Sequence, residues 1–162
     1  FSMKRLTATL CLTIAVLLGS SSVGTSDEWK KGATAFESGN LTMAVQEWTP
    51  LARQGDFRAQ SMLCALYSGP LKDYINAFSW CKIAAERGSA RAQAQLSYMY
   101  ALGEGTLRNR IYAYMWGEIS AANGIQRGGK IRDLVMKLMT SNEIAKAQTS
   151  AHNCVRKRYI GC

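Results

Sequence analysis

The chain repeats a part of its own sequence. Residues 55–67 return as residues 88–100 at an offset of 33, and six of these thirteen positions are identical. Residues 71–88 return as residues 107–124 at an offset of 36, with seven identical positions. Repeats of this length are typical of stacked supersecondary units, each of which buries its apolar face only against its neighbours. The repeats therefore predict a solenoid and favour a binding function.

Inside the repeats the apolar residues recur at helical spacing, and glycines follow each apolar run. This pattern predicts eight helices and no strand, at about 26–38, 41–54, 57–68, 72–87, 90–102, 109–123, 131–139 and 142–156. Gly128 and Gly129 are expected to open the seventh helix, and Thr140 or Ser141 to cap the eighth. The predicted fold is all-α, a right-handed α-solenoid of about four antiparallel helical hairpins over residues 27–156. Its expected core contains Leu63, Tyr67, Trp80, Leu96, Tyr100 and Trp116.

The first 26 residues resemble a secretory signal peptide rather than a part of the fold. Phe1 and Ser2 precede the apparent start Met3 and are set aside, and a short basic start, Lys4 and Arg5, comes before an apolar run at 6–18. Small residues follow that run, as at a cleavage site. A transmembrane helix needs ~20 apolar residues, so an uncleaved anchor is the weaker alternative. We expect a periplasmic or secreted protein.

Export would place the cysteines in an oxidising compartment, where an even number suggests disulfides. Four remain once the first is removed with the signal, and three pairings are possible. We favour the local one, which joins Cys64 to Cys81 and Cys154 to Cys162. Neither a metal nor a cofactor is expected, because the chain has no C-x-x-C spacing and a single histidine, His152.

The formal net charge of +9 favours anionic partners. Nucleic acid is not expected, since the predicted compartment holds little of it. A short basic tail at 157–162, which ends in Cys162, continues the cluster that begins at Arg156 and suggests contact with a membrane surface or an anionic envelope polymer. The oligomeric state does not follow from the sequence.

The repeated residues resemble Sel1-like repeats, a branch of the tetratricopeptide-type helical repeats. The second unit matches the family pattern from Ala90-Arg91-Ala92-Gln93 through the Gly103-Glu104-Gly105 loop to Trp116 and Gly124. The first unit departs from the pattern in a shortened loop at Gly69-Pro70 and in Cys64, which replaces the expected glycine. The resemblance implies an exported bacterial adaptor that holds other proteins.

A stacked-hairpin protein offers a curved groove lined by the first helix of each hairpin. The residues expected there are Arg58, Ser61, Arg91 and Tyr98, which would receive an acidic peptide segment. The sequence thus predicts a non-enzymatic scaffold. The alternative is an enzyme that acts on β-lactams or the cell wall, because Ser79 and Lys82 have the serine–lysine spacing of penicillin-binding enzymes. That motif lacks its usual partners in this chain.

Overall fold

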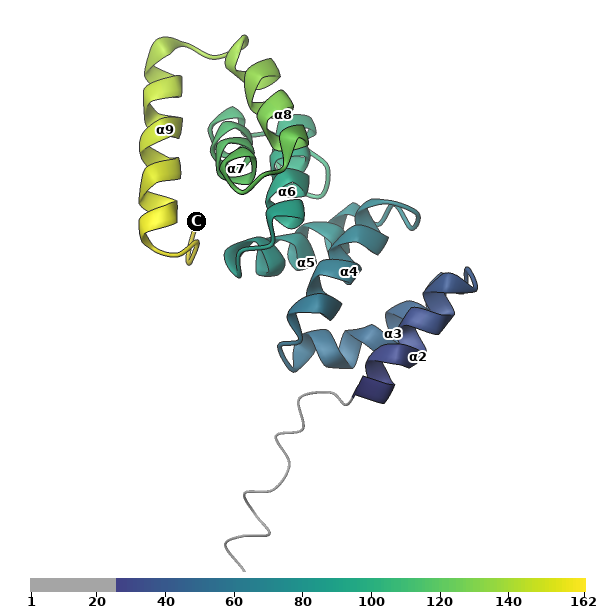
Figure 1. The fold of residues 1–162 in the computed structure, drawn as a ribbon. Coiled ribbons are helices and arrows are strands. Elements are labelled where there is room, and N and C mark those ends of the chain that lie inside the picture. The colour runs from purple at the N-terminus through teal and green to yellow at the C-terminus, as the bar shows by residue number, and fades with distance from the viewer. Residues whose placement is uncertain (1–25) are drawn as a thin grey trace, which may run out of the picture.

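The computed structural model describes residues 26–162, which form eight α-helices and no strand (Figure 1). The predicted all-α solenoid is confirmed. The predicted signal segment lies outside the described residues except for Ser26. None of the described helices is long and apolar enough to cross a bilayer. The helices are α2 (Ser26–Glu37), α3 (Leu41–Arg53), α4 (Phe57–Ser68), α5 (Tyr74–Glu86), α6 (Ala90–Leu102), α7 (Arg110–Ala122), α8 (Gln126–Met136) and α9 (Ser141–Arg156).

Six of the helices form three stacked hairpins. The pairs α2–α3, α4–α5 and α6–α7 follow one another, and the second helix of each pair packs against the first helix of the next. The last two helices differ from the expected fourth hairpin. Helix α8 packs on α6 and α7, while α9 crosses to α7 rather than packing on α8 (Figure 1). Buried Ala151 and Cys154 of α9 share a core cluster with Met115 of α7, which explains this placement.

Helix α8 begins earlier than predicted, because Gly128 and Gly129 lie inside it and do not open it. A side-chain carbon at Gly128 would clash with the Ser120 hydroxyl oxygen. One at Gly117 would lie 2.7 Å from the carbonyl oxygen of Gly128. Glycine is needed here because the two helix backbones approach closely. The last helix begins as predicted, with a capping box between Thr140 and Glu143.

The core consists of two main clusters that meet at the second hairpin. Leu63, Leu96 and Trp116 are fully buried, as predicted. The other expected core residues are only half-buried and pack at the edges of the clusters. Tyr67 and Trp80 contact both clusters and so connect the first hairpin to the rest of the stack.

A buried glutamine joins each repeat to the one before it. The Gln60 amide donates to the carbonyl oxygen of Ala52 at 2.9 Å, and the Gln93 amide donates to that of Ala85 at 3.2 Å. Each glutamine also accepts a hydrogen bond from the residue that directly follows the second helix of its own hairpin, Arg87 at 3.0 Å and Asn123 at 2.9 Å. The two bonds that the glutamine amides donate satisfy backbone carbonyls near the ends of α3 and α5.

Both local disulfides are present, which confirms the predicted pairing. Cys64 and Cys81 connect α4 to α5, and Cys154 and Cys162 connect α9 to the C-terminal residues. The tail predicted at 157–162 is therefore tied back to the helical domain.

Candidate functional site: a cleft along the first helices of the repeats

A cleft of about 580 Å³ runs between α4 and α6, the first helices of the two central hairpins. The beginning of α8 and the residues around Tyr74 and Glu104 border it. Clefts of this size are typical of ligand sites. Small side chains create the space: Ser61 and Ala65 line it from α4, and Ala94 from α6. The Ser61 hydroxyl donates to the Ser89 hydroxyl across it at 3.4 Å.

Two arginines give the cleft its charge. Arg91 lies exposed near the start of α6, and Arg127 lies near the start of α8. The Arg127 guanidinium is positioned over the ring of Tyr98 at 4.9 Å from its centroid, a cation–π geometry. Glu104 is the single carboxylate among the lining residues. The lining is therefore suited to a ligand with more negative than positive charge.

Three of the four predicted groove residues, Ser61, Arg91 and Tyr98, line this cleft, and Arg58 does not. Arg58 forms an ion pair with Asp56 at 2.9 Å, and its guanidinium lies 4.6 Å from the ring centroid of Trp29. Burial alone would raise the pKa of Asp56, but the hydrogen bonds from Arg58 and from backbone amides outweigh it and lower the pKa. Arg58 thus connects α4 to the first hairpin.

Arg127, Glu104 and Tyr74 also line the cleft, although the sequence pattern did not predict them there. None of them lies on the first helix of a hairpin, where the groove was expected. Arg127 follows directly after the second repeat, and no pattern within the repeats identifies it.

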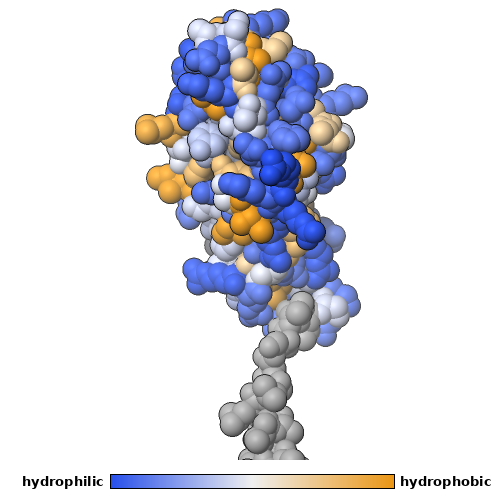
Figure 2. Space-filling view, turned by 90° about the vertical axis from the view of Figure 1, so that its left-hand side faces the viewer, coloured by the Kyte–Doolittle hydropathy of each residue, from blue (hydrophilic) through white to orange (hydrophobic). Residues whose placement is uncertain are grey.

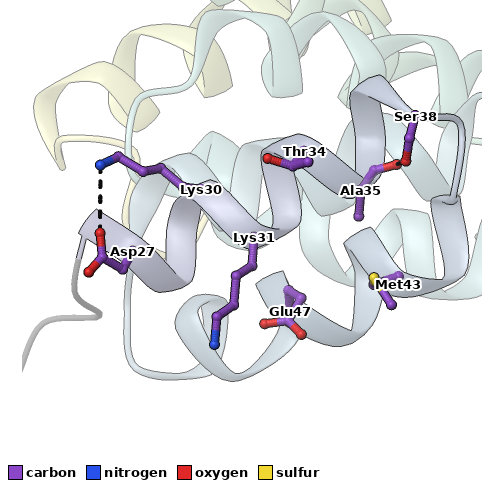
Figure 3. Close-up of a pocket in the computed structure, with 8 residues that line it drawn as sticks. All are labelled: Asp27, Lys30, Lys31, Thr34, Ala35, Ser38, Met43 and Glu47. Atoms are coloured by element: carbon purple, nitrogen blue, oxygen red, sulfur yellow. Dashed lines mark hydrogen bonds and ion pairs between the residues drawn. The ribbon is translucent and has the colours of Figure 1, made fainter.

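A second hollow lies between α2 and α3 (Figure 3). Lys30, Lys31 and Glu47 line its rim, and Lys30 pairs with Asp27 at 3.6 Å. Both partners of that pair are largely exposed, so the ion pair itself is worth little. The charges do not converge on one point, and the central cleft remains the better candidate site.

The residues of the enzymatic alternative lie elsewhere. Ser79 and Lys82 are exposed on α5, and the Ser79 hydroxyl donates to the backbone carbonyl of Ile75 at 3.2 Å. Neither residue lines the cleft. Within residues 26–162 no group of three or more metal-ligating side chains comes together.

Stacked helical hairpins with a cleft along their first helices define the class of α-solenoid repeat proteins. Two Sel1 repeats match the chain, at residues 58–89 and 90–125. They coincide with the hairpins α4–α5 and α6–α7, so the Sel1-like repeats indicated by the sequence motifs are confirmed.

A solved structure supports the same assignment. The chain is similar to c5321, a protective antigen present in uropathogenic Escherichia coli strains that displays an SLR fold, with a TM-score of 0.72 and 25% identity. The match covers 96% of this chain but 35% of the antigen, so the chain spans about a third of that protein's length. No curated protein sequence matched the chain.

Proposed function

We propose that the chain is an exported, non-enzymatic scaffold that binds an acidic segment of another protein in the cleft between α4 and α6. The observation that carries the proposal is that Arg91 and Arg127 both line one cleft, where the Arg127 guanidinium lies over the Tyr98 ring. Arginine and tyrosine combine contact area with directed hydrogen bonds and are frequent at interface hot spots. Solenoids generally use such concave surfaces for binding.

The chemistry of the cleft favours binding over catalysis. Its lining contains no histidine, and its cysteine, Cys64, is held in a disulfide. The cleft therefore has neither an imidazole base nor a thiolate nucleophile. An extended acidic segment could place carboxylates at the two arginines and small side chains over Ala65 and Ala94.

Export is supported by the disulfides. Two crosslinks in one small domain are typical of proteins that fold in an oxidising compartment. We infer a periplasmic or secreted location, which also agrees with the signal-like N-terminal sequence. Thiol labelling of protein taken directly from cells tests this part. Protein in which all four cysteines react before reduction would contradict it.

Charge reversal in the cleft tests the binding site. The variant R91E/R127E should lose the proteins that the native chain captures from an envelope fraction. The matched control R53E/K82E reverses two exposed charges away from the cleft and should capture the same proteins as the native chain. Circular dichroism checks that both variants fold. If R91E/R127E captures an unchanged set, the cleft is not the binding site.

A further inference from the structure

The C-terminal residues form a second surface, separate from the cleft. Residues 154–162 are closed into a loop by the disulfide between Cys154 and Cys162, whose Cα atoms lie 5.5 Å apart. We call these residues the disulfide loop. They contain Arg156, Lys157 and Arg158, all exposed, and the chain has no acidic residue after Glu143. None of the ion pairs within the described residues involves these three cations.

The disulfide loop also exposes apolar side chains. Ile160 is 69% exposed and Val155 is 50% exposed. Figure 2 looks onto the side of the molecule that carries α9, where hydrophobic side chains stand among strongly hydrophilic ones. Single exposed apolar residues are common. Here two of them share a short crosslinked loop with three unpaired cations.

The loop contacts the repeats through Tyr159. The Tyr159 hydroxyl accepts a hydrogen bond from the Asn123 amide at 3.3 Å. The Tyr159 ring covers Gly88, where a side-chain carbon would lie 3.6 Å from it. Arg158 and Tyr159 both adopt positive φ, at 52° and 68°, a conformation that residues other than glycine rarely take. The disulfide and the Tyr159 contacts hold this turn, and Ile160 follows it directly into solvent.

We propose that the disulfide loop docks the protein on an anionic phospholipid surface. Its cations would approach the lipid phosphates while Ile160 enters the interface, the pattern of a peripheral membrane contact. The electrostatics of the helix end explain only some of the exposed residues of the loop. A cation in the last turn of α9 stabilises the helix dipole, which accounts for Arg156 but not for an exposed isoleucine beyond the helix end. The isoleucine is also what favours a bilayer over a soluble anionic polymer.

Vesicle sedimentation tests the proposal. The apolar run at 6–18 would itself bind lipid, so the protein used is residues 25–162, which contain every described helix. The probes are vesicles of phosphatidylcholine alone and vesicles that also contain phosphatidylglycerol. The native sequence should bind the anionic vesicles and not the neutral ones, and added salt should weaken the binding.

Two variants separate the contributions. R156Q/K157Q/R158Q should bind anionic vesicles on the order of a hundredfold more weakly, given the attraction that each cation contributes near such a surface. I160S should bind about tenfold more weakly, because it removes the inserted apolar side chain. The control K31Q/R53Q/K82Q removes the same charge from exposed sites elsewhere and should change binding only a few-fold.

Three results would overturn the proposal. If the native sequence does not bind anionic vesicles, the loop is not a membrane contact. An equal loss in the control would mean that overall charge, and not this loop, drives binding. Unchanged binding by I160S would show that Ile160 does not enter the bilayer. The reason to prefer a bilayer over a soluble anionic polymer would then be lost. None of these results depends on the cleft.

Discussion

The two central hairpins hold equivalent helix pairs together by different means. In α4–α5 the contact is the covalent bond between Cys64 and Cys81. At the same repeat positions α6–α7 has Ser97 and Gly117, which lie 33 and 36 residues further along. The Ser97 hydroxyl donates to the Ala113 carbonyl oxygen at 2.7 Å, and a side-chain carbon at Gly117 would lie 2.9 Å from that hydroxyl. The repeat thus tolerates either a crosslink or close packing at this point.

The difference follows from what surrounds each hairpin. Helix α7 packs against α6, α8 and α9. Among the described helices, α5 packs substantially against α4 and α6 only. Trp116 of α7 is 1% exposed, while the equivalent Trp80 of α5 is half-buried. A hairpin with fewer packed neighbours buries less apolar surface, and a crosslink compensates for this by restricting the unfolded chain.

The largest expected difference is between the two tryptophans. Replacing Trp116 with alanine should lower the free energy of unfolding by about 3–5 kcal/mol, because a full indole leaves a cavity among packed helices. The W80A variant should lose clearly less, since its side chain is already partly in contact with water. Urea unfolding followed by circular dichroism measures both. Equal losses would show that the contact of Trp80 with both core clusters matters more than its burial.

Removing the hairpin disulfide should have the next largest effect. The variant C64S/C81S opens a loop of 17 residues, which the chain-entropy model values at about 3 kcal/mol. The control C154S/C162S opens a loop of 8 residues and should lose slightly less. Thermal unfolding of the two variants and the native protein gives the comparison. If C64S/C81S is as stable as the native protein, helix packing alone holds α4–α5 together.

The sequence carried enough information for the fold because the recurring residues act locally. Alanine and tryptophan at helical spacing determine which faces pack, and glycine after each run determines where most helices end. The beginning of α8 was misplaced, since glycine at position 128 is required by its contacts with Ser120 and Gly117, which lie on α7. The sequence alone does not show which residue of another helix such a glycine will contact.

The same limit applied to the candidate site, because helical position predicts which residues share a face but not what each of them contacts. Helical position placed Ser61, Arg91 and Tyr98 on one face, and all three line the cleft. The same criterion included Arg58, which is held instead by Asp56 in its own helix cap and by Trp29 from the preceding hairpin. Arg127 lies beyond the repeats, so its stacking on Tyr98 depends on how α8 returns to the solenoid.

Close packing in α6–α7 should be sensitive to one methyl group. The variant G117A should lower stability by about 2 kcal/mol, because the new side-chain carbon meets the Gly128 carbonyl oxygen and the Ser97 hydroxyl. The matched control is G129A, where the added carbon would be 3.4 Å from Ala121 and helix propensity improves. That control should be neutral or slightly stabilising. If G117A is as stable as the native protein, α7 and α8 can move apart at little cost in free energy.

The smallest expected difference lies in the helix caps. Asp56 caps α4 and Ser89 caps α6 at equivalent positions, so only the first cap titrates. Because the pKa of Asp56 is lowered in the folded chain, its stabilisation is present above the unfolded value of ~3.9 and is lost as the pH falls through the folded value.

The variant D56S gives α4 the cap that α6 already has. At neutral pH it should lose at most about 1 kcal/mol, since the serine keeps the cap but not the ion pair with Arg58. Urea midpoints at neutral and acidic pH should converge for the native protein and D56S as the carboxylate is protonated. A difference that persists at acidic pH would mean that packing around Asp56, and not its charge, distinguishes the two caps.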